Sequence, residues 1–205
     1  MSIQIRFALC GMLIAGVTLV ASASGAQSQP PADLVGALRQ GGHVLVMRHA
    51  SSPREVPTAQ TANADNPKLE RQLDQAGRAG ATAMGRALRD LKIPVGEVFS
   101  SPTYRALETV KFAQLANPIS VPQLGDGGQS MQGVAEVDAA WLRAKAAEAP
   151  RRGNTVIVTH MPNLARAFPA FGAVADGETV IVRPDGKGGA TPIGRVGIDD
   201  WPRLR

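Results

Sequence analysis

The chain has 205 residues, of which 19% are charged and 4% are aromatic, and its formal net charge is +5. This length suits one domain that buries a substantial core. The basic residues are scattered and aromatic side chains are few, which disfavours a nucleic-acid partner, because such proteins present a basic stripe with stacking rings. A modest positive excess instead favours anionic substrates or anionic surfaces.

Residues 1–26 have the pattern of a secretory signal peptide. Arg6 supplies a positive start, a 14-residue apolar stretch follows, and small residues come last, which is the order that a signal peptidase recognises. We expect cleavage after Ala26, with Ala23 as the second choice, and hence a single mature domain over 27–205 in the periplasm or outside the cell. The apolar run is shorter than the about 20 residues of a membrane span, so a retained N-terminal anchor is the less favoured alternative.

The only cysteine, Cys10, lies inside this segment. Cleavage would therefore leave a mature chain with no thiol, disulfide or cysteine metal site, which excludes a cysteine nucleophile. A chain without thiols is suited to an oxidising compartment. The loss of Arg6 would lower the formal net charge from +5 to +4.

The first half of the mature chain alternates helical and strand patterns. Apolar residues within 34–38 predict a brief helix, and the unbroken apolar run 44–47 predicts a strand buried on both faces of a parallel sheet. Residues 51–73 are polar and interrupted by prolines, which predicts a long loop and a partial lid. Asp74 is placed to cap a helix that runs to Leu91 with one apolar face.

The second half continues the alternation. After a strand at 97–101, Ser101 is predicted to cap a helix with Pro102 at its first position. The further predicted elements, in chain order, are a strand at 119–121, a glycine-rich loop at 123–133, a helix at 134–150, a strand at 154–159, a helix at 162–168, and strands at 179–182 and 195–198. This order predicts one α/β domain.

Cationic side chains stand where predicted strands end. Arg48 and His49 end the first strand, His160 follows the most apolar one, and Arg105 lies in the helical turn after another. In open α/β sheets ligands bind beyond the carboxyl ends of the strands. If these strands are parallel neighbours, the four groups share one rim, and we expect an anionic, phosphorylated ligand there.

Phosphoryl transfer requires such a set. Arginine supplies planar, bidentate donors to the phosphoryl oxygens, a neutral imidazole can attack phosphorus and hold the group covalently, and a second imidazolium can neutralise charge. A carboxylic acid then protonates the leaving oxygen. Two histidines with an acid could also suggest a metal site, but two arginines aimed at the same pocket would repel a cation.

Three segments carry a resemblance to the histidine phosphatase superfamily, also called the phosphoglycerate mutase-like family. Arg48-His49-Ala50 at a strand end resembles its Arg-His-Gly signature. Residues 100–109, Ser-Ser-Pro-Thr-Tyr-Arg-Ala-Leu-Glu-Thr, are similar to its second motif, Ser-Ser-Pro-x-x-Arg-Ala-x-x-Thr. Val158-Thr159-His160 resembles its third motif, and the order and spacing agree from residue 43 to about 182.

The resemblance implies a three-layer α/β sandwich in which helices cover both faces of a mostly parallel central sheet. It implies that His49 is the nucleophile that becomes phosphohistidine, and that Arg48, Arg105 and His160 complete the phosphate pocket. It also implies catalysis without a metal ion or an organic cofactor.

The proton donor is the least defined part of this resemblance. In many members it is a Glu or Asp in the loop after the second arginine, and Asp126 is the best-placed candidate. Glu136 and Asp138 are poorer candidates because they begin a predicted helix. Another branch places an Asp directly after the second histidine, but His160 is followed by Met161.

These features predict an exported histidine acid phosphatase-type hydrolase of phosphomonoesters, with a phosphorylated small molecule or an envelope glycan as substrate. A phosphohistidine phosphatase is one alternative, because a nitrogen leaving group needs no acid, although the usual protein substrates of such enzymes are cytoplasmic. A mutase is less favoured, because phosphosugar metabolites are not expected outside the cytoplasm. The competing class is a non-catalytic phosphate or anion binder that retains the pocket and lacks the acid.

Four other polar residues are predicted to be structural or solvated. His43 begins the first strand, at the end opposite the site, and Glu108 lies in a helix where packing contacts are the simpler interpretation. Arg54 is a loop charge that could touch substrate, and Glu178 is expected to be exposed or bridging, with a role near His160 as the alternative.

Overall fold

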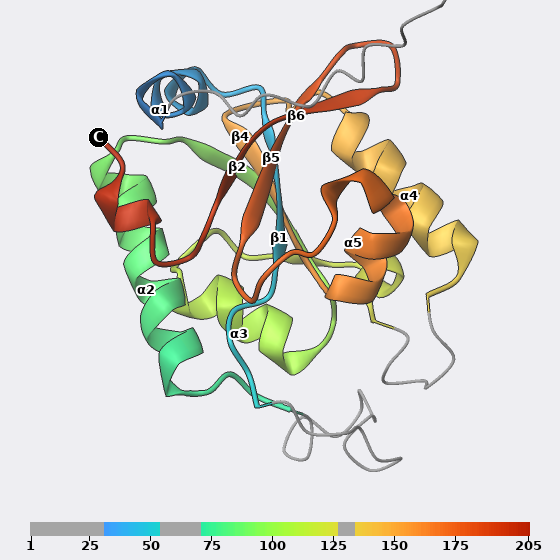
Figure 1. Cartoon of the computed structure of the whole chain (residues 1–205), viewed down its shortest axis with the longest axis horizontal. Helices are drawn as coiled ribbons and strands as arrows, with labels where there is room; N and C mark the ends of the chain where they lie inside the picture. Colours follow the sequence, from blue (N-terminus) through green and yellow to red (C-terminus); the bar gives the residue numbers. More distant parts are fainter. Residues whose placement is uncertain (1–30, 54–70, 127–133) are drawn as a thin grey trace, which may run out of the picture.

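The computed structural model of the protein describes residues 31–53, 71–126 and 134–205 (Figure 1). The predicted signal peptide, its cleavage site and Arg54 lie outside the described residues, so these predictions stay predictions. Among the described helices, none is long and apolar enough to cross a membrane.

One sheet organises the described part of the chain. Its strands are β1 (Val44–Arg48), β2 (Val95–Ser100), β3 (Ile119–Ser120), β4 (Asn154–Thr159), β5 (Thr179–Pro184) and β6 (Ala190–Val196). Their order across the sheet is β3-β2-β4-β1-β5-β6. β3, β2, β4 and β1 run parallel, whereas β5 is antiparallel to both of its neighbours, β1 and β6. The prediction of a mostly parallel central sheet is confirmed.

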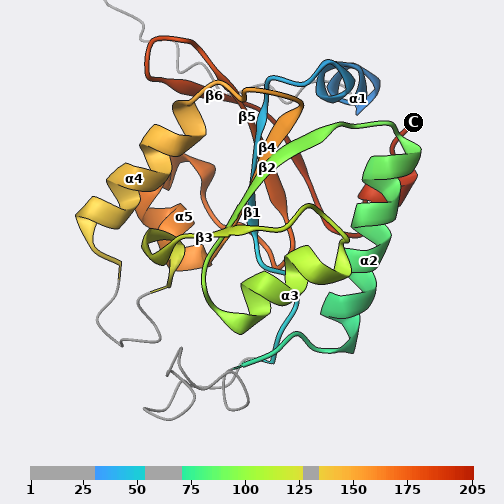
Figure 2. The ribbon, with the colours of Figure 1, turned by 180° about the vertical axis from the view of Figure 1, so that it is seen from behind.

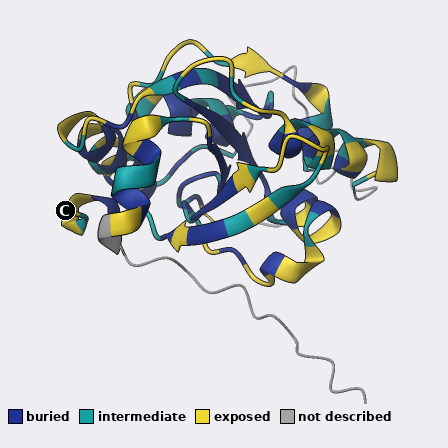
Figure 3. Ribbon diagram, turned by 90° about the horizontal axis from the view of Figure 1, so that it is seen from above, coloured by how far each residue is buried: buried dark blue, intermediate teal, exposed yellow. Residues whose placement is uncertain are grey.

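Helices cover both faces of this sheet, as predicted (Figures 1 and 2). The helices are α1 (Pro31–Gln40), α2 (Gln75–Asp90), α3 (Tyr104–Phe112), α4 (Glu136–Ala147) and α5 (Met161–Ala167), with short 3₁₀ turns η1 (Pro122–Leu124), η2 (Pro169–Phe171) and η3 (Trp201–Arg203). α1, α2, α3 and η3 share one core with the sheet, and α4 and α5 share the other. The buried residues gather on the strands and on the inward sides of the helices (Figure 3).

Strand β1 explains why the sheet needs both layers. Its side chains alternate between the faces: Leu45 and Met47 join the core under α1–α3, while Val44 and Val46 join the core under α4 and α5. Each of the four is at most 2% exposed. Full burial of such side chains stabilises the fold by roughly 1.5–3 kcal/mol each. The unbroken apolar run therefore corresponds to a strand buried on both faces, as predicted.

The start of α2 is fastened to the end of β1. Asp74 is the predicted N-cap, because its Oδ1 accepts a hydrogen bond from Gly77 N at 2.7 Å, and its Oδ2 accepts one from Ser51 Oγ at 2.7 Å. A Cβ at Gly77 would lie 2.1 Å from Ser51 O, so only glycine permits this approach. The end of the long loop is thereby held beside its beginning, close to the rim.

Two predicted boundaries are wrong. The helix predicted to start at Pro102 begins at Tyr104, with Thr103 before it. Ser101 does accept a hydrogen bond from Thr103 N at 3.2 Å, but it lies outside the helix. The strand predicted at 195–198 is β6, which covers 190–196; Pro192 and Gly194 weaken the strand pattern there, and pairing with β5 forms the strand in spite of them.

Candidate active site

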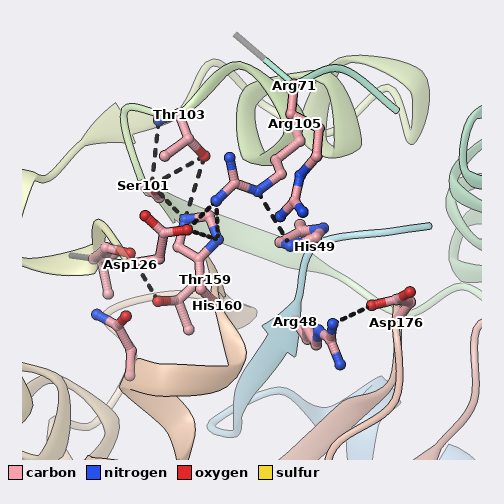
Figure 4. A network of polar contacts seen from close by, with 12 residues as sticks. Arg48, His49, Arg71, Ser101, Thr103, Arg105, Asp126, Thr159, His160 and Asp176 are labelled. Carbon is pink, nitrogen blue, oxygen red and sulfur yellow. Dashed lines mark hydrogen bonds and ion pairs between the residues drawn. The ribbon is translucent and has the colours of Figure 1, made fainter. Parts of the chain in front are cut away.

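Three neighbouring strands bring the predicted site residues together. β1 and β4 are parallel, with Arg48 opposite Thr159, so His49 and His160 leave the sheet side by side. Their ring centroids are 5.1 Å apart. β2 lies on the other side of β4, and its end leads into the helix that carries Arg105. The predicted convergence at one rim is confirmed (Figure 4).

The surroundings of His49 prepare it for nucleophilic attack. The side chain is 3% exposed, and Nδ1 lies 2.8 Å from the carbonyl oxygen of Ala50, which can only accept a hydrogen bond. The proton of the neutral ring is therefore on Nδ1, and Nε2 carries the lone pair. Thr109 of the second motif fixes this turn, because its Oγ1 accepts a hydrogen bond from Ala50 N at 3.0 Å.

The charge state of His49 also suits a nucleophile. Burial, and after it the nearby Arg105 charge, lower the pKa of His49 from 6.5 to about 3, although the hydrogen bond to the Ala50 carbonyl acts in the opposite direction. The imidazole is therefore neutral at neutral pH. Arg105 Nε donates a hydrogen bond to His49 Nε2 at 3.3 Å, so the cation lies at the atom that would attack phosphorus.

His160 carries its proton on the other ring nitrogen. Its Nδ1 lies 3.2 Å from Arg105 Nη2, which can only donate, so Nδ1 accepts. Nε2 then donates to Ser101 Oγ at 2.8 Å, with Thr103 Oγ1 at 3.3 Å. The ring is 1% exposed, and burial, followed by the Arg105 charge, lowers the pKa of His160 well below its ordinary value. His160 is thus neutral and rigidly oriented.

Arg105 is the centre of the site. It lies in the first turn of α3, is 3% exposed, and contacts both histidines. Its Nη2 also forms an ion pair with Asp126, whose Oδ2 is 3.9 Å from His160 Nδ1. The structure therefore places Asp126 inside the pocket, at the position where phosphoryl oxygens would compete for the same guanidinium.

The segment before Asp126 is held by β4 and α5. Thr159 Oγ1 donates to Leu124 O at 2.9 Å, and Asn163 Nδ2 donates to Gln123 O at 3.0 Å. Leu124 is completely buried. The η1 turn is thus anchored on both sides of its apolar residue, and the chain enters the pocket directly after it.

Arg48 lies at the rim but points to one side of His49 (Figure 4). Its Nη1 donates to Val174 O at 3.0 Å, and its Nη2 pairs with Asp176 Oδ1 at 2.5 Å. Both partners belong to the segment between η2 and β5. Its predicted phosphate contact stays a prediction, because a phosphoryl group would have to share this guanidinium with Asp176.

Arg71 is the main component that sequence reasoning missed. Its side chain extends towards His49 beside Arg105 (Figure 4), and its Nη1 donates to Pro53 O at 3.2 Å. Its charge adds to the effects of burial and of Arg105 that lower the pKa of both histidines. Ser101 and Asp176 were also missed as site residues. The only signal for Arg71 was its place just before a helix, at the end of a loop that starts from the site.

The remaining polar candidates have structural contacts. Glu108 Oε2 accepts a hydrogen bond from Leu73 N at 2.7 Å, which confirms a packing role. Glu178 bridges Ala175 N and Arg195. His43 is buried at the far end of β1.

The acids that begin α4 lie outside this cluster. Glu136 pairs with Arg143 and Arg166, while Asp126 has a place in the pocket. As for metals, the ranges 31–53, 71–126 and 134–205 contain no group of three His, Cys, Asp or Glu side chains arranged as ligands.

Comparison with known proteins agrees with this geometry. Residues 44–126 match the family model described as histidine phosphatase superfamily (branch 1), a range that includes the first two motifs and Asp126. No curated protein matches the chain at a significant level.

Solved structures share the fold at low identity. The protein histidine phosphatase SixA in complex with tungstate is 18% identical, with a TM-score of 0.57 over 77% of this chain and 98% of its own. The product of open reading frame Rv3214 from Mycobacterium tuberculosis is 18% identical, with a TM-score of 0.52 over 74% and 95%. A mutant phosphoserine phosphatase from Entamoeba histolytica, in complex with phosphoserine, is 11% identical, with a TM-score of 0.50 over 76% and 97%.

Two histidines of opposite tautomer lie on either side of a buried arginine at the carboxyl ends of parallel strands, in the order of the three motifs. The family model covers the first two motifs, and the third completes the same rim. Over residues 44–126 the chain matches the histidine phosphatase superfamily, and its described part has the fold of the solved histidine phosphatase structures.

Proposed function

We propose that this protein is an exported phosphatase that hydrolyses phosphomonoesters through a phosphohistidine on His49. The observation that carries the proposal is the neutral, buried His49, whose unprotonated Nε2 faces Arg105. A buried nucleophile with a fixed tautomer beside a phosphate-binding cation is the arrangement that covalent phosphoryl transfer requires.

Substrate binding begins with an exchange of partners at Arg105. In the structure this guanidinium contacts His49 Nε2 and the Asp126 carboxylate. A phosphoryl dianion binds arginine in the same bidentate way and carries more charge than a carboxylate. It therefore takes over Arg105, which releases the lone pair of His49 and frees Asp126 to turn towards the leaving group.

The chemical step then proceeds in two halves. Once the phosphoryl group has displaced it from Arg105, Asp126 takes up a proton from solvent. His49 Nε2 then forms a bond to phosphorus while the ester oxygen leaves and takes this proton from the Asp126 carboxylic acid. Water then attacks the phosphohistidine, Asp126 accepts its proton, and inorganic phosphate leaves with His49 neutral again. Arg105, Arg48 and Arg71 hold the phosphoryl oxygens, and His160 donates to the group once it is protonated.

A phosphohistidine phosphatase is the second candidate. The observation that favours it is the pairing of Asp126 with Arg105, which leaves the acid engaged in the ligand-free site. A phosphohistidine substrate releases nitrogen and does not depend on this acid. The solved structure with a TM-score of 0.57 is a protein histidine phosphatase, which supports testing this class of substrate.

Activity against a substrate panel tests the proposal. The protein, purified from cells that express the full chain, is assayed with EDTA on an aryl phosphate, several alkyl phosphomonoesters and a phosphohistidine peptide. Turnover of the esters that disappears in His49→Ala, with an acid-labile phosphate trapped on the wild type, supports the proposal. Hydrolysis confined to the phosphohistidine peptide supports the second candidate. Phosphate binding without turnover on any substrate would instead identify a non-catalytic binder.

Export rests on the pattern of residues 1–26 and has its own test. The mass of the protein recovered from the periplasm of a Gram-negative expression host should correspond to a chain that begins at Gln27. An intact chain in the cytoplasmic fraction would contradict export, and an intact chain in the membrane fraction would indicate a retained anchor.

A further inference from the structure

A second feature with the dimensions of a ligand site lies away from the histidines. It is a groove of about 1080 Å³ between α2 and the C-terminal residues 201–205, and none of His49, Arg105, Asp126 or His160 lines it. Figures 1 and 2 show the C-terminal turn beside α2 from both sides. Ligand pockets in proteins are typically about 300–1,000 Å³, so the groove is large enough for an extended small molecule.

The lining of this α2 groove is mainly apolar. Ala79 and Ala83 follow one another along the outer side of α2, and their small side chains leave room between the helix and its neighbours. Phe112 and Leu204 provide larger, partly exposed apolar surfaces, and the buried Trp201 lies behind the groove wall. A groove with apolar walls and a few convergent charged groups is the usual form of a ligand site.

Four arginines also line the groove, against one acid, Asp90. They are Arg39, Arg78, Arg86 and Arg205. Arg78 is partly compensated, because it lies 3.9 Å from Glu108 and above the Phe112 ring. The other three pair with no carboxylate among the described residues; Arg39 and Arg205 donate to backbone carbonyls. The groove therefore combines apolar walls with an uncompensated positive charge.

We propose that the α2 groove binds an anionic amphiphile, a molecule with one apolar chain and a negatively charged headgroup. The apolar chain packs along Ala79, Ala83 and Leu204, where it is removed from water. The headgroup binds the arginines, which donate charge-assisted hydrogen bonds to a carboxylate or phosphate. Charge complementarity selects this occupant over a neutral lipid or a basic peptide.

Fluorescence quenching of Trp201 tests the proposal directly. The chain has two tryptophans, and Trp141 lies against Phe99 on the opposite face of the sheet, so Trp141→Phe leaves Trp201 as the reporter. The probe is 11-bromoundecanoate, whose bromine quenches an indole at short range even when the ring is buried, and its neutral analogue is 11-bromoundecanol. We expect saturable quenching by the acid below its micelle concentration, and roughly tenfold weaker binding of the alcohol.

Variants locate the headgroup contact. Arg86→Glu should weaken binding of the acid about tenfold or more and leave binding of the alcohol nearly unchanged, while Arg151→Glu, at an exposed position outside the groove, serves as the matched control. Inorganic phosphate at a concentration that fills the histidine pocket should weaken binding of the acid only as far as chloride of equal ionic strength does, because an ion without an apolar chain binds exposed arginines weakly.

Four results would overturn the proposal. One is an absence of saturable quenching, and another is equal binding of acid and alcohol that Arg86→Glu does not change. The third is competition by phosphate beyond that of chloride at equal ionic strength, which would place the probe in the histidine pocket. The fourth is quenching that weakens as protein concentration rises, together with a dimer in sedimentation, which would assign the groove to a second copy of the chain.

Discussion

The histidine pocket and the α2 groove both present arginines, but the two regions hold them differently. In the pocket, Arg105 is 3% exposed and contacts two imidazoles and a carboxylate. In the groove, Arg86 is exposed. A buried cation with fixed partners is already oriented for the charge that develops in a reaction. An exposed cation is screened by water and salt, and can attract an anion without orienting it for chemistry.

Of the variants considered, His49→Ala should cause the largest loss of hydrolytic activity. Removal of the nucleophile should lower kcat for aryl phosphate hydrolysis by at least about 10³-fold, as measured by steady-state kinetics. His43→Ala is the matched control, because His43 directly precedes β1, at the end away from the site, whereas His49 directly follows it. A similar loss in both variants would indicate unfolding, and residual wild-type turnover in His49→Ala would contradict the covalent mechanism.

Asp126→Asn should separate substrates by their leaving groups. Without an acid to protonate the departing oxygen, alkyl phosphates should be hydrolysed about 10²–10⁴-fold more slowly, while an activated aryl phosphate should lose much less. The slope of log kcat against leaving-group pKa measures the difference. An unchanged slope would show that Asp126 only occupies Arg105 in the absence of substrate.

Burial of His49 should make stability depend on pH. Because the pKa of His49 is about 3 in the folded protein and about 6.5 in the unfolded chain, the unfolded chain binds the extra proton between these values. The free energy of unfolding should therefore fall as the pH is lowered from about 6.5 towards 3, by up to about 1.4 kcal/mol per pH unit for this group. Urea unfolding at several pH values measures the slope, and His49→Gln should show a smaller one. Equal slopes in the two proteins would contradict the buried, neutral imidazole.

Arg71→Ala should have a smaller effect, mainly on binding. Loss of one charge-assisted contact to the phosphoryl group corresponds to roughly tenfold in KM. We expect kcat to change less, because Arg71 neither attacks phosphorus nor transfers a proton in the proposed mechanism. Arg151→Ala, at an exposed position, is the control. A fall in kcat with KM unchanged would instead show that Arg71 contacts the phosphoryl group only in the transition state.

Arg86→Glu should have the smallest effect on hydrolysis. Kinetics on a small aryl phosphate should agree with the wild type within about twofold, because exposed charges beyond a Debye length are largely screened. A larger change would mean that the groove and the pocket are coupled. The contacts that could connect the two regions begin in the groove, where Arg78 lies near Glu108. Glu108 in turn accepts a hydrogen bond from the backbone of Leu73, two residues after Arg71.

Local pattern was sufficient for most of the fold and for the centre of the site. Strand β1 carries the unbroken apolar run 44–47, and β4 carries the run 156–158 between polar residues; such runs are stable only when both faces of a sheet are covered. Asp74 has the side chain of an N-cap and acts as one. β6 was misplaced because Pro192 and Gly194 have little strand propensity, and only the neighbouring strand compensates for it.

Amino-acid sequence alone determined that Arg48, His49, Arg105 and His160 would meet, because residues that follow parallel strands share one edge of the sheet. Tertiary structure decided how they are paired. The approach of Arg71, the contact of Arg48 with Asp176 and the pairing of Arg105 with Asp126 each join segments far apart in the chain. Neither periodicity nor local propensity encodes such contacts, because these contacts depend on how the loops pack against the sheet in the folded protein.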